Sequence, residues 1–152
     1  MKLFYFADFM HLKQFGVPIT FDNYVNLEHG PIPSAIKNLV DTASDDIDNS
    51  VLADTISIER PKGTDMCRII GIRKFSEEDS RLFSKAELET LKKACIRFGN
   101  KNTKDIEEAS HKESAWLKTS LLEDIPYSLA TEDKDCKINK EEIEFLEQIV
   151  CR

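Results

Sequence analysis

The chain has 152 residues, 41% hydrophobic and 32% charged, which suits one folded domain with an ordinary core. Its net charge of -7 makes nucleic acid an improbable partner, because phosphate contacts require clustered Lys and Arg. No run reaches the ~18–20 consecutive apolar residues that span a bilayer, so we expect no membrane segment. The four cysteines are widely spaced without a CxxC pair, which favours reduced thiols in a cytoplasmic protein.

Residues 2–15 predict a core helix, because they are too apolar for a surface helix and too interrupted for a membrane one. Asp8, His11 and Lys13 also break the apolar run that a signal peptide would need, so we do not expect export. Gly16 is placed to end this helix, and Pro18 follows shortly after.

The stretch NYVNLEHGPIPSAIKNL, residues 23–39, predicts a rigid corner between a short strand at 24–27 and a helix that runs to about residue 43. Pro31 and Pro33 fix their own φ angles and bias the preceding residues away from helix. Gly30 supplies whatever unusual turn geometry the corner needs.

Residues 54–73 predict an antiparallel hairpin. The alternating DTISIE run and the β-branched MCRIIGIR run, residues 66–73, flank a loop with Pro and Gly. A two-stranded ribbon is marginal alone, so we expect the strand at 24–27 to be available to join it. The predicted fold is therefore α+β and mostly α, one domain over residues 1–152 with a small antiparallel sheet.

Three further helices are predicted after residue 83. Ser84 and Glu87 have the spacing of a capping box, Thr103 is placed to cap the next helix, and Asn139 is placed to cap a last helix at about 140–151. We expect two of these helices to bury apolar stripes: Leu88, Leu91, Cys95 and Phe98 in the first, and Ile143, Leu146, Ile149 and Val150 in the last.

The residues alone indicate no catalytic, metal or cofactor site. His11 with Asp8 has the spacing of an oriented imidazole, but no cysteine lies in a nucleophile motif and no GxSxG occurs. The three histidines show no HxxxH or Cys-His metal spacing, and the five glycines are never clustered around a phosphate motif. What remains is a binding module, in which Trp116 is a candidate interface anchor.

Three segments, taken in order, resemble the Panacea domain, the SocA-like antitoxin family that includes GepA-type phage-associated proteins. They are KLFYFADFMHLKQFGVPIT, EHGPIPSAI and SKAELETLKKACIRFGNKNTKDIEEASHKESAW, within residues 2–120. The positions that we expect to be structural or partner-binding are Tyr5, Phe6, Ala7, His11, Gly16, Pro18, Gly30, Pro31, His111 and Trp116. Lys2, Leu3, Ser84, Gly99 and Ser110 also match. His29 replaces a usual aromatic, and the short segment that commonly precedes the Lys-Leu motif is missing, so we expect a truncated or alternatively started chain.

The resemblance implies a non-enzymatic antitoxin that neutralises a cognate protein toxin by direct binding, in a toxin-antitoxin system of a bacterium or phage. A protease or chaperone system is a further candidate partner, and masking of the toxin and its delivery to a protease both stay open. Two alternatives are carried forward. A hydrolase would bring His11, Asp8, His29 or His111 together with a cysteine in one pocket. A DNA-binding regulator would need a basic surface, which the net charge disfavours.

Overall fold

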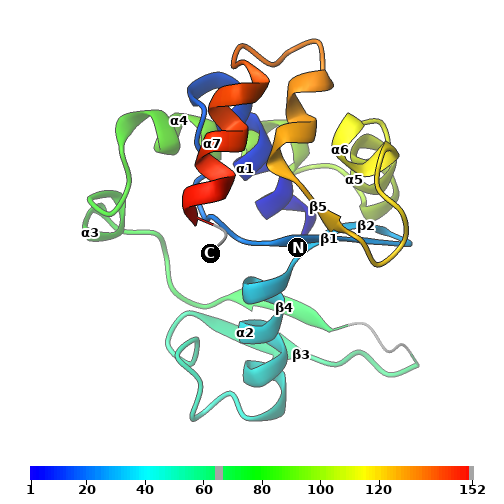
Figure 1. The fold of residues 1–152 in the computed structure, drawn as a ribbon. Coiled ribbons are helices and arrows are strands. Elements are labelled where there is room, and N and C mark those ends of the chain that lie inside the picture. Colours follow the sequence, from blue (N-terminus) through cyan, green and yellow to red (C-terminus); the bar gives the residue numbers. More distant parts are fainter. Residues whose placement is uncertain (64–66, 151–152) are drawn as a thin grey trace. The chain divides into compact units, whose positions relative to one another are not determined.

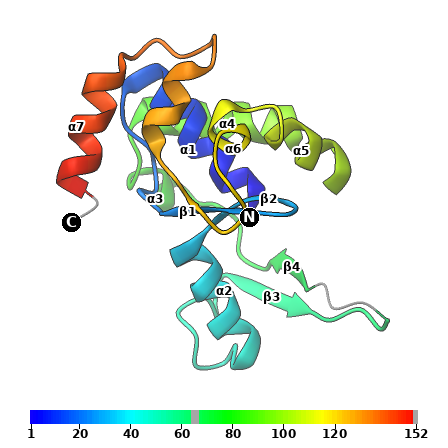
Figure 2. The same ribbon diagram turned by 45° about the vertical axis from the view of Figure 1, so that its right-hand side comes forward.

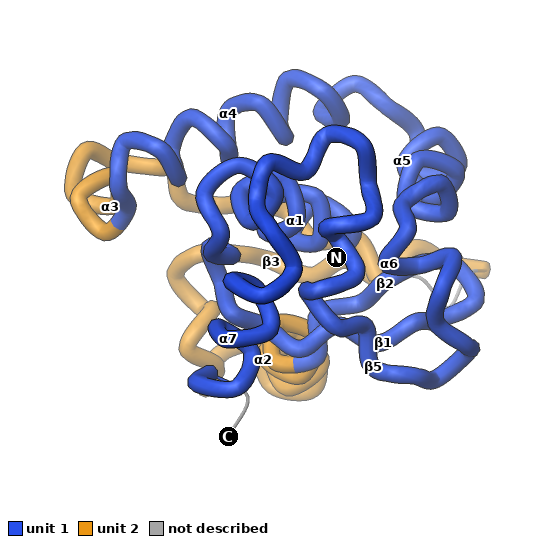
Figure 3. Tube along the Cα trace, turned by 45° about the horizontal axis from the view of Figure 1, so that its top comes forward, with its two compact units in different colours: residues 1–34, 83–152 blue, residues 35–82 orange. Residues whose placement is uncertain are grey.

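The computed structural model describes residues 1–63 and 67–150. The chain divides into two compact units, one formed by Met1–Ser34 with Phe83–Arg152 and the other by Ala35–Leu82 (Figure 1 and Figure 3). Helices dominate and the sheets are small and antiparallel, which confirms the predicted α+β, mostly α class. The expectation of a single domain stays a prediction.

The first unit is built around α1 (Lys2–Phe15), as the sequence predicts. Gly16 ends this helix in the left-handed conformation, with φ 80°, and its N–H donates to Leu12 O. The side chains of Tyr5, Phe6, Phe9 and Leu12 are fully buried on one side of α1. The helix packs against α4 (Lys85–Phe98), β2 (Gly30–Pro33), η1 (Tyr127–Glu132) and α5 (Thr103–Ser110), so most of the unit is assembled on it (Figure 2).

The sheet of the first unit contains β1 (Tyr24–Leu27), β2 (Gly30–Pro33) and β5 (Asp124–Ile125), in the order β2-β1-β5. The prediction that residues 24–27 could join the hairpin at 54–73 is wrong, because β1 pairs on both sides within this sheet. The segment we took for a corner is itself a strand. Ser34 N donates to Asn23 O, so alternation places the nitrogens of Pro31 and Pro33 toward the open edge, where a missing N–H is harmless.

Four helices and one 3-10 helix complete the first unit. They are α4 (Lys85–Phe98), α5 (Thr103–Ser110), α6 (Ser114–Leu117), the 3-10 helix η1 (Tyr127–Glu132) and α7 (Lys140–Val150). Their buried side chains close the core over α1 and β1 with Phe98, Ala115, Tyr127, Ala130 and Ile143. The region after α6 therefore belongs to the same hydrophobic core as the N-terminal helix.

Two of the three predicted helix caps are confirmed. Ser84 and Glu87 form the full capping box at the start of α4. Asn139 Oδ1 accepts a hydrogen bond from Glu142 N at 2.9 Å before α7. At α5 the cap is Asn102 rather than Thr103, with Asn102 Oδ1 accepting from Asp105 N at 2.9 Å. Asn is as good a cap as Thr, and sequence alone did not distinguish adjacent positions.

The predicted apolar stripes of α4 and α7 are partly wrong. In α4 the buried positions are Thr90, Ala94 and Phe98, whereas Cys95 is exposed. The rings of Phe6 and Phe98 stack with centroids 4.1 Å apart, which fixes the rotation of α4 about its axis. In α7 Ile143 is buried, but Ile149 and Val150 are exposed, because the helix packs on η1 along one narrow face.

The second unit contains α2 (Ser34–Asp45), whose first residue belongs to the first unit, the hairpin of β3 (Ile56–Glu59) and β4 (Arg68–Gly71), and the short α3 (Glu77–Ser80). The predicted hairpin is confirmed, although Met66, the start of its predicted second strand, lies outside the described residues. Among residues 35–63 and 67–82, only Ala43 is buried, so this unit has almost no core of its own. No helix in the described part of the chain is long and apolar enough to cross a bilayer.

Candidate functional site

The three segments that resemble the family motifs meet at the turn between β1 and β2. Gly30 is buried there with φ +109°, a conformation that L side chains rarely adopt. A Cβ atom at Gly30 would lie 2.7 Å from Ser110 Oγ and 3.0 Å from Lys2 Cε. Residues of the first and third segments thus approach the backbone of the second so closely that only glycine fits.

Polar and aromatic side chains surround this junction. We call this set the motif surface and define it as Lys2, His29, Glu107, His111 and Trp116. His29 has a side chain that is 75% exposed, and its Nδ1 lies 3.2 Å from Glu107 Oε1. The hydrogen bond from His29 lowers the pKa of Glu107, and the positive field of Lys2 acts in the same direction. Burial lowers the pKa of Lys2 itself.

An imidazole–indole stack forms the other side of the motif surface. The rings of His111 and Trp116 are nearly parallel, at 14°, with centroids 3.8 Å apart. Trp116 Nε1 donates to Leu27 O at 3.5 Å, which ties α6 to the end of β1. Within the described part of the chain, His111 Nε2 is buried without a hydrogen-bond partner. The stack is half-buried, so it presents a rigid flat edge rather than a mobile side chain.

Asn26 holds α6 in place through side-chain hydrogen bonds, and the sequence analysis missed it. Its side chain is buried, and Nδ2 donates to Trp116 O at 3.1 Å and to Thr119 O at 2.9 Å. A polar residue inside a short apolar strand is the one sequence signal that could have identified it. These bonds hold the carbonyl of Trp116, within α6, and the carbonyl of Thr119, two residues after the helix ends.

Asp8 and His11 bind the loop after α1 rather than each other. The Asp8 carboxylate accepts hydrogen bonds from Ile19 N at 2.9 Å, from Thr20 N at 2.8 Å, from the Thr20 hydroxyl, and from the Tyr24 hydroxyl at 2.8 Å. Burial raises the pKa of Asp8, although these four bonds act against that shift. His11 Nδ1 donates to Val17 O at 2.8 Å. Both side chains therefore fix the chain that leads from α1 into the sheet.

The other motif positions lie in the interior or at turns. Tyr5, Phe6 and Ala7 lie on the side of α1 that faces the core, and Gly16 caps that helix. Pro18 and Pro31 are almost completely buried. Only Gly30, His111 and Trp116, of the ten motif positions, belong to the junction and its surface. The motif thus divides into residues that build α1 and its loop and residues that build the surface at the β1–β2 turn.

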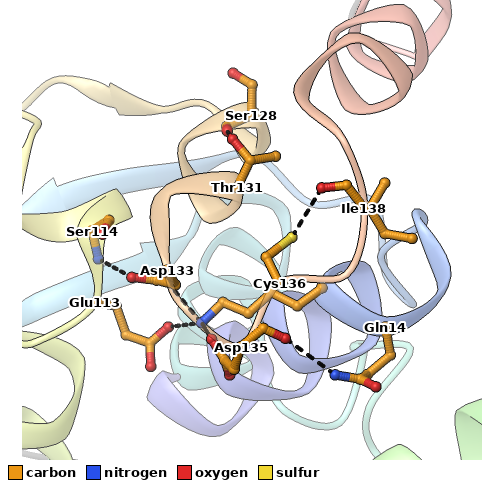
Figure 4. Close-up of polar contacts among 10 residues, drawn as sticks. Gln14, Glu113, Ser114, Ser128, Thr131, Asp133, Asp135, Cys136 and Ile138 are labelled. Atoms are coloured by element: carbon orange, nitrogen blue, oxygen red, sulfur yellow. Dashed lines mark hydrogen bonds and ion pairs between the residues drawn. The ribbon is translucent and has the colours of Figure 1, made fainter.

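A buried lysine cluster was also missed by the sequence analysis. The side chain of Lys13 is 3% exposed and forms ion pairs with Glu113, with Asp133 at 2.8 Å and with Asp135 at 3.3 Å (Figure 4). Asp133 Oδ1 also accepts from Ser114 N at 2.9 Å. Lys13 follows Phe9 by one helical turn on the core side of α1, and that position was the available signal.

The lysine cluster connects α1 to the segment after η1. Lys137 N donates to Lys13 O at 2.8 Å. Gln14 Nε2 donates to Asp135 O at 3.4 Å (Figure 4). Although burial alone lowers the pKa of Lys13, the bonds to Asp133 and Glu113 raise it overall. Burial acts to raise the pKa of Asp133, but the hydrogen bonds from Lys13 and Ser114 outweigh it, and the pKa of Asp133 is lowered overall. Lys13 is therefore held in its charged form.

The fold is that of a small, mostly helical α+β protein. A model of the family described as antitoxin SocA-like, Panacea domain, matches residues 1–117, and the chain belongs to this family. No curated protein and no solved structure matches the chain. The matched residues contain the whole motif surface and Lys13, whereas η1 and α7 follow them.

Proposed function

We propose that this chain is a cytoplasmic antitoxin that neutralises a cognate protein toxin by direct binding and catalyses no reaction itself. Membership of an antitoxin family supports a toxin as the kind of partner. The observation that carries the proposal is the junction at Gly30, where all three motif segments meet beneath an exposed His29 and the His111–Trp116 stack. Rigid aromatic groups beside charged ones are the usual anchors of protein interfaces.

The two alternatives receive less support. The hydrolase alternative requires a cysteine beside a histidine, but Cys95 lines an apolar hollow with no histidine in its lining, and Cys136 Sγ donates to Ile138 O at 3.5 Å. His11 and Asp8 are bonded to the loop after α1. A DNA-binding regulator finds no support in the charge of -7. The toxin-binding function therefore agrees best with the residues at the motif surface.

Growth rescue tests the proposal. A toxin encoded beside this chain should arrest growth alone and be neutralised by co-expression of the wild-type chain. We expect Trp116→Ala to weaken toxin binding by about 30-fold or more, as for a typical interface anchor of ~2 kcal/mol, and His29→Ala to weaken it less. Rescue should fail first for Trp116→Ala when expression is lowered.

A matched control separates binding from folding. Ile96→Ala removes an exposed apolar side chain from α4, outside the motif surface, and should rescue growth as the wild type does. Thermal unfolding of each purified variant shows whether the fold is retained. Full rescue by a folded His29→Ala, Trp116→Ala double variant would contradict the assignment of this surface. Neutral growth with every neighbouring gene would contradict the antitoxin function.

A further inference from the structure

An apolar hollow lies between α1 and α4, and none of the motif surface residues lines it. It has a volume of about 180 Å³ and is lined by Leu3, Phe4 and Ala7 of α1 and by Leu91, Ala94 and Cys95 of α4. Leu3 and Phe4 are each 42% exposed, so the hollow is open to solvent along α1. An apolar cavity of ~150 Å³ is large enough to hold a benzene ring. The hollow can therefore accept one aromatic side chain.

One edge of this hollow, the rim on α4, carries two lysines. Lys85 and Lys92 lie seven residues apart on the same side of the helix, both are exposed, and none of the ion pairs among the described residues involves them. Lys92 follows Leu91 directly and precedes Cys95 by three residues, which places it on the side of the helix that borders the hollow. Positive charge at this rim stands out in a chain whose net charge is -7.

The outward face of α7 has the complementary character. Phe145 is 64% exposed and Ile149 is 59% exposed, one turn apart on the same face, opposite the buried Ile143. Glu141 is exposed one turn before Phe145 on that face. The helix carries four glutamates and a single lysine, so this apolar stripe of one aromatic and one aliphatic side chain is surrounded by acidic residues. α7 thus presents an aromatic side chain that could fill the hollow and a negative charge that could pair with Lys92.

We propose that α7 of one copy of this chain docks into the hollow between α1 and α4 of a second copy. The Phe145 ring enters the hollow, and Glu141 approaches Lys92 at the rim. Both surfaces belong to the first unit and occur once in each chain, so each copy supplies one helix and one hollow. Reciprocal docking would give a closed dimer, and non-reciprocal docking a longer assembly. This self-association does not depend on the toxin-binding function.

Charge exchange tests the contact. Sedimentation of the purified full chain over a concentration series measures its association. Lys92→Glu and Glu141→Lys should each weaken association by about tenfold or more, because each places like charges together. An equimolar mixture of the two variants should associate like the wild type. In a mixed pair, one contact is wild type and the other has its two charges exchanged.

Two further readouts locate the contact. Phe145→Ala should weaken association without changing the helical content measured by circular dichroism, because Phe145 is exposed in the single chain. Thiol modification of Cys95 should slow as concentration rises, whereas Cys67, exposed in the other unit, is the internal reference. A chain that stays monomeric at all concentrations would overturn the proposal. Association that the mixture fails to restore, or that leaves Cys95 reactive, would overturn it as well.

Discussion

Replacement of Lys13 by Met is expected to lower the free energy of unfolding by about 3–5 kcal/mol, the usual effect of removing one partner from a buried ion pair. Met keeps the length and apolar stem of the side chain, so packing in α1 is largely retained. The loss comes from Glu113 and Asp133, whose side chains are only 15% and 12% exposed and are left without their cation. Urea unfolding of both proteins measures the difference.

Lys118→Met is the matched control for this prediction. Lys118 pairs with Glu132 at the surface, where its side chain is 52% exposed, so its removal should cost about 0–1 kcal/mol. Combining Lys13→Met with Glu113→Gln and Asp133→Asn should recover part of the loss, because the uncompensated charges are then removed. Equal, small losses for Lys13→Met and Lys118→Met would contradict a stabilising role for the buried cluster.

The Lys13 contribution should also depend on pH in a defined direction. The pKa of Lys13 is raised above its ordinary value of 10.5, so the folded state holds this proton more tightly than the unfolded state. The stabilisation is therefore fully present below pH 10.5 and is lost as the pH rises through the folded pKa. The stability difference between wild type and Lys13→Met should shrink over that alkaline range and stay constant near neutral pH.

Replacement of Gly30 by Ala is the second change with a large expected effect, about 2–4 kcal/mol of destabilisation. One part is backbone strain, since φ is +109° at Gly30. The other part is steric, because the new Cβ would lie 2.7 Å from Ser110 Oγ inside the junction. Thermal or urea unfolding measures the sum, and growth rescue should fail as the motif surface is displaced.

Two comparisons separate these parts. Gly16→Ala has a similar positive φ of +80° but meets only ordinary contacts with Ile138, so it should cost about 1–2 kcal/mol. Adding Ser110→Ala to Gly30→Ala should recover the part of the steric cost that Ser110 Oγ causes, and leave the strain and the 3.0 Å approach to Lys2 Cε. If Gly30→Ala were no more destabilising than Gly16→Ala, the close approach of Ser110 to Gly30 would be contradicted.

Local sequence signals predicted the local structure well. The helix 2–15, its end at Gly16 and the Ser84–Glu87 capping box depend on residues within one or two turns, and all are confirmed. The predicted partner of β1 was wrong because its neighbouring strand β2 was interpreted as a corner, and because its other partner, β5, lies far away in the sequence. Two prolines made residues 30–33 look like a corner, whereas an edge strand tolerates them.

The candidate site was predictable only in part. The resemblance named Gly30, His111 and Trp116. Nothing in the sequence showed that Gly30 lies against Ser110 and that His111 stacks on Trp116, while Tyr5, Pro18 and Pro31 are interior. The Lys13 cluster was missed because its carboxylates are 100 or more residues away. Exposure of Ile149 was missed because helical periodicity shows which residues share a face, but not how much of that face is covered.

Amide hydrogen exchange of the chain with and without its purified toxin tests the central claim most directly. We predict that toxin slows exchange at the β1–β2 turn, around His29 and Gly30, and in residues 107–117, and that Trp116→Ala removes this protection at the same concentrations. A complex that leaves both segments unprotected, or toxin neutralised without any complex, would contradict the account.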